Sequence, residues 1–234
     1  MSELPYSFEP VPGHKNYKVT SMLRDYLGLL MEDPENRKSI DQILGLIDGY
    51  IEQLRHLRTI NSEETIQEVF KAVDGFFETA PQENKNEIQC KLGCTACCFI
   101  EIESSGDEAA AIINYCKENN IGIDQEYLTK QAETGRKTFS EVSRCVFLKD
   151  NLCSIYPVRP IACRKHWVKT DPVLCDFSKN IINKVGGYFD LNTEILASAL
   201  LNVEETGSFE KMLLRELDKT FTPDEKNLPE ISGD

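Results

Sequence analysis

The sequence predicts a mainly α-helical fold, with a bundle-like helical part at the N-terminus and a small cysteine-rich module that contains a short β-hairpin. Three helical patterns of apolar residues precede a segment in which four cysteines occupy nine positions, CKLGCTACC at 90–98. Further helical patterns follow that segment. Apolar residues make up 41% of the 234 residues and charged residues 28%, which is the composition of a globular chain with its own core.

The N-terminal part carries three stretches of apolar residues at helical spacing. They span Met22–Leu30, Ile40–Leu57 and Ile66–Phe77. The residues DPEN at 33–36 separate the first two, and Asn61 with Glu64 forms a capping-box pattern ahead of the third. These stretches predict three helices, and PQENKNE at 81–87 is interpreted as a polar connector after them.

The elements expected in the cysteine-rich segment, about 88–178, are shorter. FIEIE at 99–103 predicts a strand, and Ser105 with Glu108 caps a helix that continues through AAAIINYC. A further helix is expected over 123–139. CVFLKDNLCSIY at 145–156 predicts two strands around a turn at Lys149, Asp150 and Asn151.

Helical patterns return towards the C-terminus. Pro160 suits the first position of a helix, so PIACRKHWV at 160–168 predicts a short one. Apolar residues at helical spacing over 191–200 and 209–217 predict two more. The expected organisation is a helical region over 1–85, a cysteine-cluster domain over 86–180, C-terminal helices over 181–224 and a tail over 225–234.

Charge and hydropathy argue against several classes of protein. A net charge of −13 disfavours general nucleic-acid binding, which needs Lys and Arg to replace counterions. No stretch approaches the ~20 apolar residues of a membrane span, and the N-terminus lacks the apolar run of a signal peptide. We therefore expect a cytoplasmic protein without a membrane partner. Nine cysteines that stay reduced in that compartment point to metal before disulfides.

Eight of the nine cysteines form two groups. The first has the pattern C-x3-C-x2-C-C, and the second follows about fifty residues later; the members are Cys90, Cys94, Cys97, Cys98, Cys145, Cys153, Cys163 and Cys175. Short spacings let thiolates converge on one ion or cluster, and Gly93 eases the tight loop because glycine tolerates a positive φ. Cys116 stands apart on the apolar side of an expected helix, and we interpret it as a core residue.

Cys97 and Cys98 are adjacent, and neighbouring side chains leave the backbone in different directions. The pair therefore indicates two metal atoms, or one ligand with a second thiol beside the site. Eight thiolates suit two tetrahedral zinc ions or two iron–sulfur clusters, so the count alone permits both. The predicted cysteine-rich module is accordingly a metal-bound one.

The residues around the cysteines include cations and one histidine. Arg144 and Arg164 each adjoin a candidate ligand and are expected to offset the negative charge of a thiolate site. His14 and His56 are interpreted as surface residues. His166 follows Cys163 by three and shares its helix face, but we do not count it among the expected ligands.

These motifs resemble a known family. C-KLG-C-TA-CC, then RC-VFLKDN-L-C-SIYPVRPIA-C-R and Cys175, are similar to the CxxCxxCC family of zinc- or iron-chelating, YkgJ-like proteins. One departure is the x3 spacing between the first two cysteines, where the family name has x2. The resemblance covers about 88–176 and implies metal binding at the eight cysteines above. A related cysteine cluster in the flagellin lysine N-methylases implies an iron–sulfur enzyme as the alternative.

The spacing of Cys90, Cys94 and Cys97 is also that of radical-SAM enzymes. Those usually have an aromatic residue before the third cysteine, where this chain has Ala96, and βα units after it, where this chain has helical patterns. We therefore predict a metal-binding protein whose cofactor is an iron–sulfur cluster or Zn²⁺. The clustered spacing and the adjacent pair favour iron–sulfur. The N-terminal helices are the expected surface for a protein partner, and enzymatic activity stays open.

Overall fold

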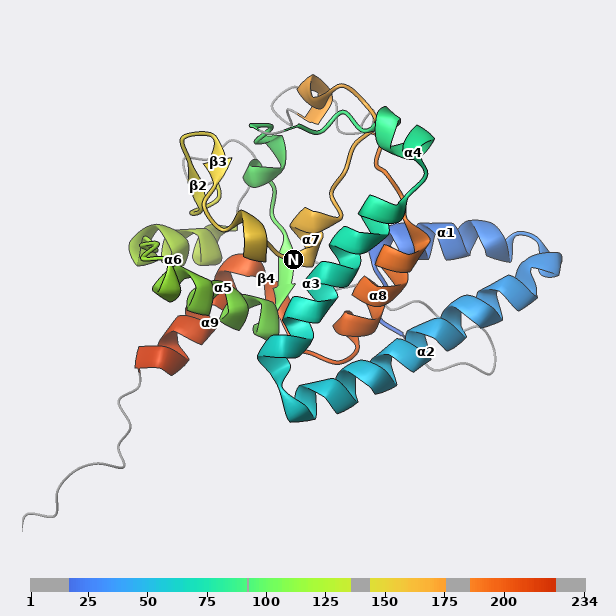
Figure 1. The fold of residues 1–234 in the computed structure, drawn as a ribbon, viewed down its shortest axis with the longest axis horizontal. Coiled ribbons are helices and arrows are strands. Elements are labelled where there is room, and N and C mark those ends of the chain that lie inside the picture. Colours follow the sequence, from blue (N-terminus) through green and yellow to red (C-terminus); the bar gives the residue numbers. More distant parts are fainter. Residues whose placement is uncertain (1–16, 92, 136–143, 176–185, 222–234) are drawn as a thin grey trace, which may run out of the picture.

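The structure, a computed structural model, describes residues 17–91, 93–135, 144–175 and 186–221 and confirms a mainly helical fold (Figure 1). The α-helices are α1 (Ser21–Met31), α2 (Arg37–Ile60), α3 (Ser62–Thr79), α4 (Gln82–Glu87), α5 (Gly106–Glu118), α6 (Gln125–Thr134), α7 (Ile161–Arg164), α8 (Leu191–Leu201) and α9 (Phe209–Phe221). Short 3-10 helices are η1 (Pro34–Asn36), η2 (Ala96–Phe99), η3 (Tyr156–Val158) and η4 (Pro172–Cys175). The strands pair antiparallel, β1 (Glu103–Ser105) with β4 (Thr206–Ser208) and β2 (Leu148–Lys149) with β3 (Leu152–Cys153).

Helices α1, α2 and α3 confirm the three helical stretches expected in the N-terminal part. The Asn61 side chain accepts the Glu64 N–H at 3.1 Å and so caps α3 as predicted. The apolar stripe of α2 is buried and lies against α3 and α8. Helix α8 is buried from Thr193 to Leu200 and packs on α1, α2 and α3, so a C-terminal helix completes the N-terminal bundle.

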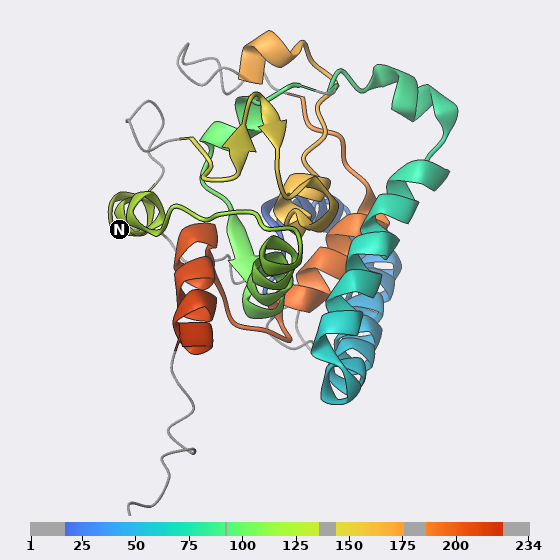
Figure 2. The same ribbon diagram turned by 60° about the vertical axis from the view of Figure 1, so that its left-hand side comes forward.

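A second group of helices, α5, α6 and α9, packs beside this bundle (Figure 2). Strand β1 leads into α5 and β4 leads into α9, and their pairing holds the two helix starts together. Ser105 and Glu108 form the predicted capping box at the start of α5. The rings of Phe147 and Phe209 meet edge-on, with centroids 6.0 Å apart. Buried residues of both helical groups form one continuous hydrophobic core.

Two polar segments differ from the sequence prediction. Residues 82–87 form helix α4 where a connector was expected, and they are mostly good helix formers that follow Pro81. The strand expected over 99–103 begins only at Glu103, because residues 96–99 turn into η2. These short elements lack an apolar period, so the sequence pattern alone does not place them.

Two expected helices are shorter than predicted. The helix expected over 123–139 is α6, which ends before Gly135, whose φ is +69°. Residues 136–143 lie outside the described part of the chain. The helix expected over 160–168 stops at Arg164, after one turn. None of the helices in the described ranges has the length and apolar composition needed to cross a bilayer.

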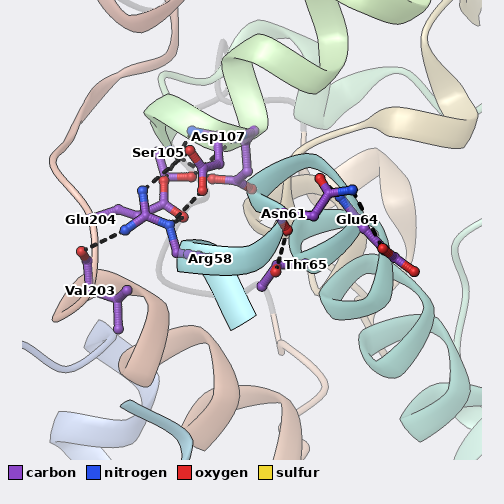
Figure 3. A network of polar contacts seen from close by, with 9 residues as sticks. Arg58, Asn61, Glu64, Thr65, Ser105, Asp107, Val203 and Glu204 are labelled. Atoms are coloured by element: carbon purple, nitrogen blue, oxygen red, sulfur yellow. Dashed lines mark hydrogen bonds and ion pairs between the residues drawn. The ribbon is translucent and has the colours of Figure 1, made fainter. Parts of the chain in front are cut away.

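A polar network joins α2, α5 and the segment that follows α8 (Figure 3). Arg58 near the end of α2 donates from Nε to Asp107 Oδ2 at 2.6 Å and from Nη1 to the Val203 carbonyl at 3.1 Å. Glu204 accepts the Asp107 N–H at 3.0 Å, and its Oε1 lies 3.5 Å from Arg58 Nε. One guanidinium therefore contacts two carboxylates, that of Asp107 at the start of α5 and that of Glu204 after α8.

Candidate metal centre

The first cysteine group lies on a compact loop between α4 and β1. Gly93 has a φ of +83°, which confirms the positive φ expected in the turn between Cys90 and Cys94. Cys97 and Cys98 follow on η2. The N–H groups of Cys94 and Cys98 each donate to a carbonyl three residues earlier, at 3.0 and 2.8 Å. Consecutive tight turns therefore bring these four thiols within one short loop.

The predicted hairpin carries the next two cysteines. Asp150 and Asn151 have φ of 48° and 60°, so they form the two-residue turn that matches the twist of a hairpin. Cys153 lies on β3, and Cys145 precedes β2. The Cys145 N–H donates to the Cys98 carbonyl at 2.8 Å. This hydrogen bond ties the hairpin to the first cysteine group across a long stretch of sequence.

The chain after α7 returns to the first group. Cys163 lies on α7, and a few residues later the Val168 N–H donates to Cys90 Sγ at 3.3 Å. Hydrogen bonds from backbone N–H groups favour the thiolate form of a cysteine. Trp167 stacks on Phe77 of α3 with ring centroids 4.4 Å apart. The return segment is thus fixed to the helical bundle on one side and to a candidate ligand on the other.

Seven of the eight candidate cysteines line one cavity of about 320 Å³. Its lining comes from residues of η2, the β2–β3 hairpin, α7 and η4. Figures 1 and 2 show these elements towards one end of the molecule. The cysteines in its lining are Cys90, Cys94, Cys97, Cys98, Cys153, Cys163 and Cys175. Cys145 is not part of the lining but is held beside it by its bond to Cys98. The fold therefore collects thiols from well-separated segments.

One set of neighbouring thiols is centred on Cys90 and Cys175. Burial raises the pKa of Cys175, and the thiols of Cys90, Cys94 and Cys97 raise it further. Burial also raises the pKa of Cys90, and the hydrogen bond from the Val168 N–H partly offsets this rise. The thiols of Cys94 and Cys97 raise the pKa of Cys90 further. These four cysteines are close enough for their charges to interact.

A second set is centred on Cys98. A hydrogen bond with Cys97 contributes most to raising the pKa of the Cys98 thiol, burial adds to it, and Cys145 and Cys153 act in the same direction. Burial raises the pKa of Cys153, where Cys97 is again a neighbour. Cys97 therefore lies between the two sets. Cys163 lines the same cavity.

The donor chemistry of this cavity suits zinc or iron–sulfur, which both take thiolate ligands. In the described parts of the chain, no group of three or more His, Cys, Asp or Glu side chains is arranged to hold a metal ion as it stands. Metal binding also requires the thiols to lose protons, because burial and mutual repulsion keep several of them in the neutral form.

The cavity lining is cationic although the chain is acidic. Lys91, Arg159 and His166 line the cavity, and none of the described residues in its lining is an Asp or Glu. Burial lowers the pKa of His166, and the neighbouring Lys165 lowers it further, so the imidazole is neutral near pH 7. Removing protons from several thiols creates negative charge in this space. A cationic lining compensates that charge.

The two arginines singled out in the sequence lie in different surroundings. Arg164 is buried next to Cys163, and its side chain is 2% exposed. Arg144 is exposed, and its carbonyl accepts hydrogen bonds from Tyr127 and Gln131. Arg159, in the string YPVRP between two candidate cysteines, was not singled out from the sequence. Charge compensation by any of these residues stays a prediction.

Cys116 and His56 have the surroundings expected of them. Cys116 is 3% exposed in α5, among the buried side chains of Ile112 and Ile113. Burial raises its pKa to about 11, so it is a protonated core thiol. His56 is exposed on α2, and His14 lies outside the described residues.

Comparison with known families agrees with this geometry. Residues 89–181 match the CxxCxxCC family model. The description of that model is "Putative zinc- or iron-chelating domain". The CxxCxxCC match includes all eight candidate cysteines and covers less than half of the chain. No curated protein and no solved structure matches the chain. The family thus supports metal binding at the cysteine-rich segment and leaves the identity of the metal open.

Proposed function

We propose that this protein binds iron or zinc in the cavity through the thiolates of its eight clustered cysteines. The observation that carries the proposal is the cavity itself, which brings together cysteines from the 90–98 loop, the hairpin, α7 and η4. Scattered core cysteines would not share one cationic space. A reducing compartment such as the cytoplasm keeps such thiols available for metal.

The two sets of neighbouring thiols support two adjacent centres. Cys90, Cys94 and Cys175 lie on the side of the first set, and Cys98, Cys145 and Cys153 on the side of the second, with Cys97 between them. We favour iron–sulfur over zinc because adjacent thiols fit a multinuclear site better than a single tetrahedral ion.

The residues of the chain have separable tasks in this proposal. The cysteines supply the ligands, the Val168 N–H stabilises the Cys90 sulfur, and Trp167 and Leu148 limit the access of water. An iron–sulfur cluster would supply one-electron chemistry at this place, whereas zinc would chiefly cross-link the segments. The chain also has to take up the protons released from the thiols, or pass them to solvent.

The metal content of protein purified without oxygen tests the proposal. We expect stoichiometric metal, with brown colour, iron and acid-labile sulfide for the favoured cluster. Cys94→Ala should lose about half of the metal, because Cys94 belongs to the first of the two sets of thiols. Cys116→Ala removes a thiol from the core and is the matched control, expected to keep its metal. A wild type free of iron and zinc, or equal loss in both variants, contradicts the proposal.

An iron–sulfur enzyme is the second candidate, favoured by the size of the cavity. A volume of about 320 Å³ is at the lower end of the range for small-molecule sites. A redox-active cluster in the isolated protein supports this candidate, and colourless zinc protein argues against it. A protein partner at the N-terminal helices also stays a proposal, supported by the exposed side chains of Leu29, Met31 and Leu46.

A further inference from the structure

Two guanidinium groups share one carboxylate between α3 and the cysteine cavity. Arg164 Nη1 pairs with Asp74 Oδ2, and Arg159 Nη2 lies 3.5 Å from Asp74 Oδ1. The arginine side chains are 2% and 12% exposed, whereas Asp74 is 41% exposed. Two positive charges thus face the Asp74 carboxylate, and the buried Glu108 carboxyl also interacts electrostatically with Arg164.

The surrounding chain holds both arginines in place. Arg164 donates from Nε to the Arg159 carbonyl at 2.9 Å and from Nη2 to the Pro157 carbonyl, and its guanidinium lies 4.2 Å from the centre of the Phe70 ring. The Arg159 guanidinium lies 3.9 Å from the centre of the Tyr156 ring, and Nη1 donates to the Tyr156 carbonyl at 2.8 Å. Neither charge can move away from the cavity without breaking these contacts.

The thiols nearest to this charge are candidate ligands. Arg159 lines the cavity together with Cys153 and Cys163, and Arg164 is the neighbour of Cys163 in the sequence. Among the described residues that line the cavity, none is an Asp or Glu. The Arg159 guanidinium, which lines the cavity, is therefore placed to act on these thiols.

Metal binding makes this space more negative. Four neutral thiols that lose their protons and bind one divalent ion give a site with a formal charge of −2, and the four protons leave to solvent. A fixed positive charge nearby lowers the free energy of the loaded state more than that of the empty one. Because the interior is less polarisable than water, the effect extends over several ångströms.

We propose that Arg159 and Arg164 raise the metal affinity of the cysteine cavity by their charge, and that Asp74 on α3 reduces this effect. The inference rests on the proposed function and deepens it. The three residues are positioning and charge-setting residues rather than ligands. Their arrangement makes the N-terminal helical bundle part of the control of metal affinity, since Asp74 belongs to α3.

The direction of the change in Zn²⁺ affinity distinguishes an effect of charge from a purely structural role of these residues. Arg159→Gln removes a positive charge and should weaken Zn²⁺ binding about tenfold, as is typical for residues that support metal ligands. Asp74→Asn keeps the shape but removes the opposing negative charge, so it should tighten Zn²⁺ binding about two- to fivefold, since the carboxylate is partly exposed. If Asp74 served only to hold the arginines, its loss would weaken binding instead.

The measurement is the apparent dissociation constant for Zn²⁺, obtained by competition with a chelator at fixed pH in the full-length, reduced protein without oxygen. Arg159→Lys keeps the charge and should stay near wild type, which controls for misfolding. Lys149→Gln removes an exposed charge that does not line the cavity and should have little effect.

Three results overturn the inference: shifts of the same sign in Arg159→Gln and Asp74→Asn, no shift in either, or no Zn²⁺ binding by the wild type. If Cys94→Ala lowers the amount of bound Zn²⁺ while these shifts fail to appear, the proposed function stands and only the inference falls. If the protein contains no metal as isolated and binds none, both the proposed function and the inference are wrong.

Discussion

Cys97 and Cys98 are neighbours in the sequence, yet their thiols have different surroundings. Cys97 raises the pKa values of Cys90, Cys175 and Cys153. The pKa of Cys98 is raised by Cys97 itself and by Cys145 and Cys153. Closing both sulfurs on a single ion would make a strained small ring. The pair is better placed to join two metal atoms than to share one.

Serine substitutions of this pair should separate the two centres. We expect Cys97→Ser and Cys98→Ser each to remove about half of the bound metal, because each sulfur serves a different set of ligands. The remaining metal should give different absorption spectra in the two variants. If one variant lost all the metal and the other none, one centre with a spectator thiol would remain.

Single residues also show what the sequence could and could not predict. The cysteines and Gly93 were predictable, because spacing and a required positive φ are local properties. Arg159 was not, because a cation among other basic residues is usually solvated. Arg159 contacts Asp74, which also pairs with Arg164 over a sequence separation of 90 residues. Such a contact exists only in the folded chain.

At the scale of elements, the network of Arg58, Asp107 and Glu204 joins α2 to α5 (Figure 3). Burial raises the pKa of Glu204 to about 7; the Asp107 carboxylate adds to this, whereas the Asp107 N–H, Arg58 and Ser105 oppose it. The folded protein therefore binds this proton more tightly than the unfolded chain. Stability from Glu204 is present at low pH and is lost as the pH rises from about 4.5 to about 7.

Glu204→Gln should remove this pH dependence. The amide resembles the protonated carboxyl, so the variant should exceed the wild type in free energy of unfolding by about 2–3 kcal/mol at pH 8. The difference should vanish near pH 4.5. Denaturant unfolding of both proteins at several pH values measures it, and the shared pH dependence of metal binding cancels in the difference. If Glu204→Gln were less stable than the wild type at pH 8, the stabilisation from the Arg58 ion pair would exceed the cost of burying the Glu204 carboxylate.

Elements with a strong apolar period were predictable, and polar ones were not. The stripe of apolar residues from Ile40 to Leu54 predicted α2, and the capping residue Asn61 predicted the start of α3. Strands β1 and β4 have three residues each and are mostly polar, so only their mutual pairing defines them. Helix α4 likewise has no buried residue.

The whole molecule has one hydrophobic core that extends through both helical groups. Helix α8 lies inside the N-terminal bundle, and α5 packs on α3 as well as on α9. The boundaries between 1–85, 86–180 and 181–224 stay a prediction. Within the expected cysteine domain, α5 is anchored in the core and so are Phe147, Ile155, Val158 and Ile161, whereas none of the described residues of the 90–98 loop is buried.

Metal removal should therefore loosen the protein locally. Structural zinc contributes on the order of 10 kcal/mol to folding in small peptides, so its loss removes much of what holds 89–100 and 144–175 together. We expect limited proteolysis of metal-free protein to cut these two segments first. Helices α2, α3 and α8 should persist because of their buried apolar residues. Equal protection of loops and helices with and without metal would contradict this expectation.

Trp167 is the only tryptophan of the chain, and it lies between the cavity and Phe77 of α3. The single indole of the chain therefore lies where the cysteine-bearing loops meet the helical bundle. Its emission reports from one known place without any label. Quenching by a bound metal, and separation of the indole from its stacked ring, can therefore be followed in the unmodified protein in real time.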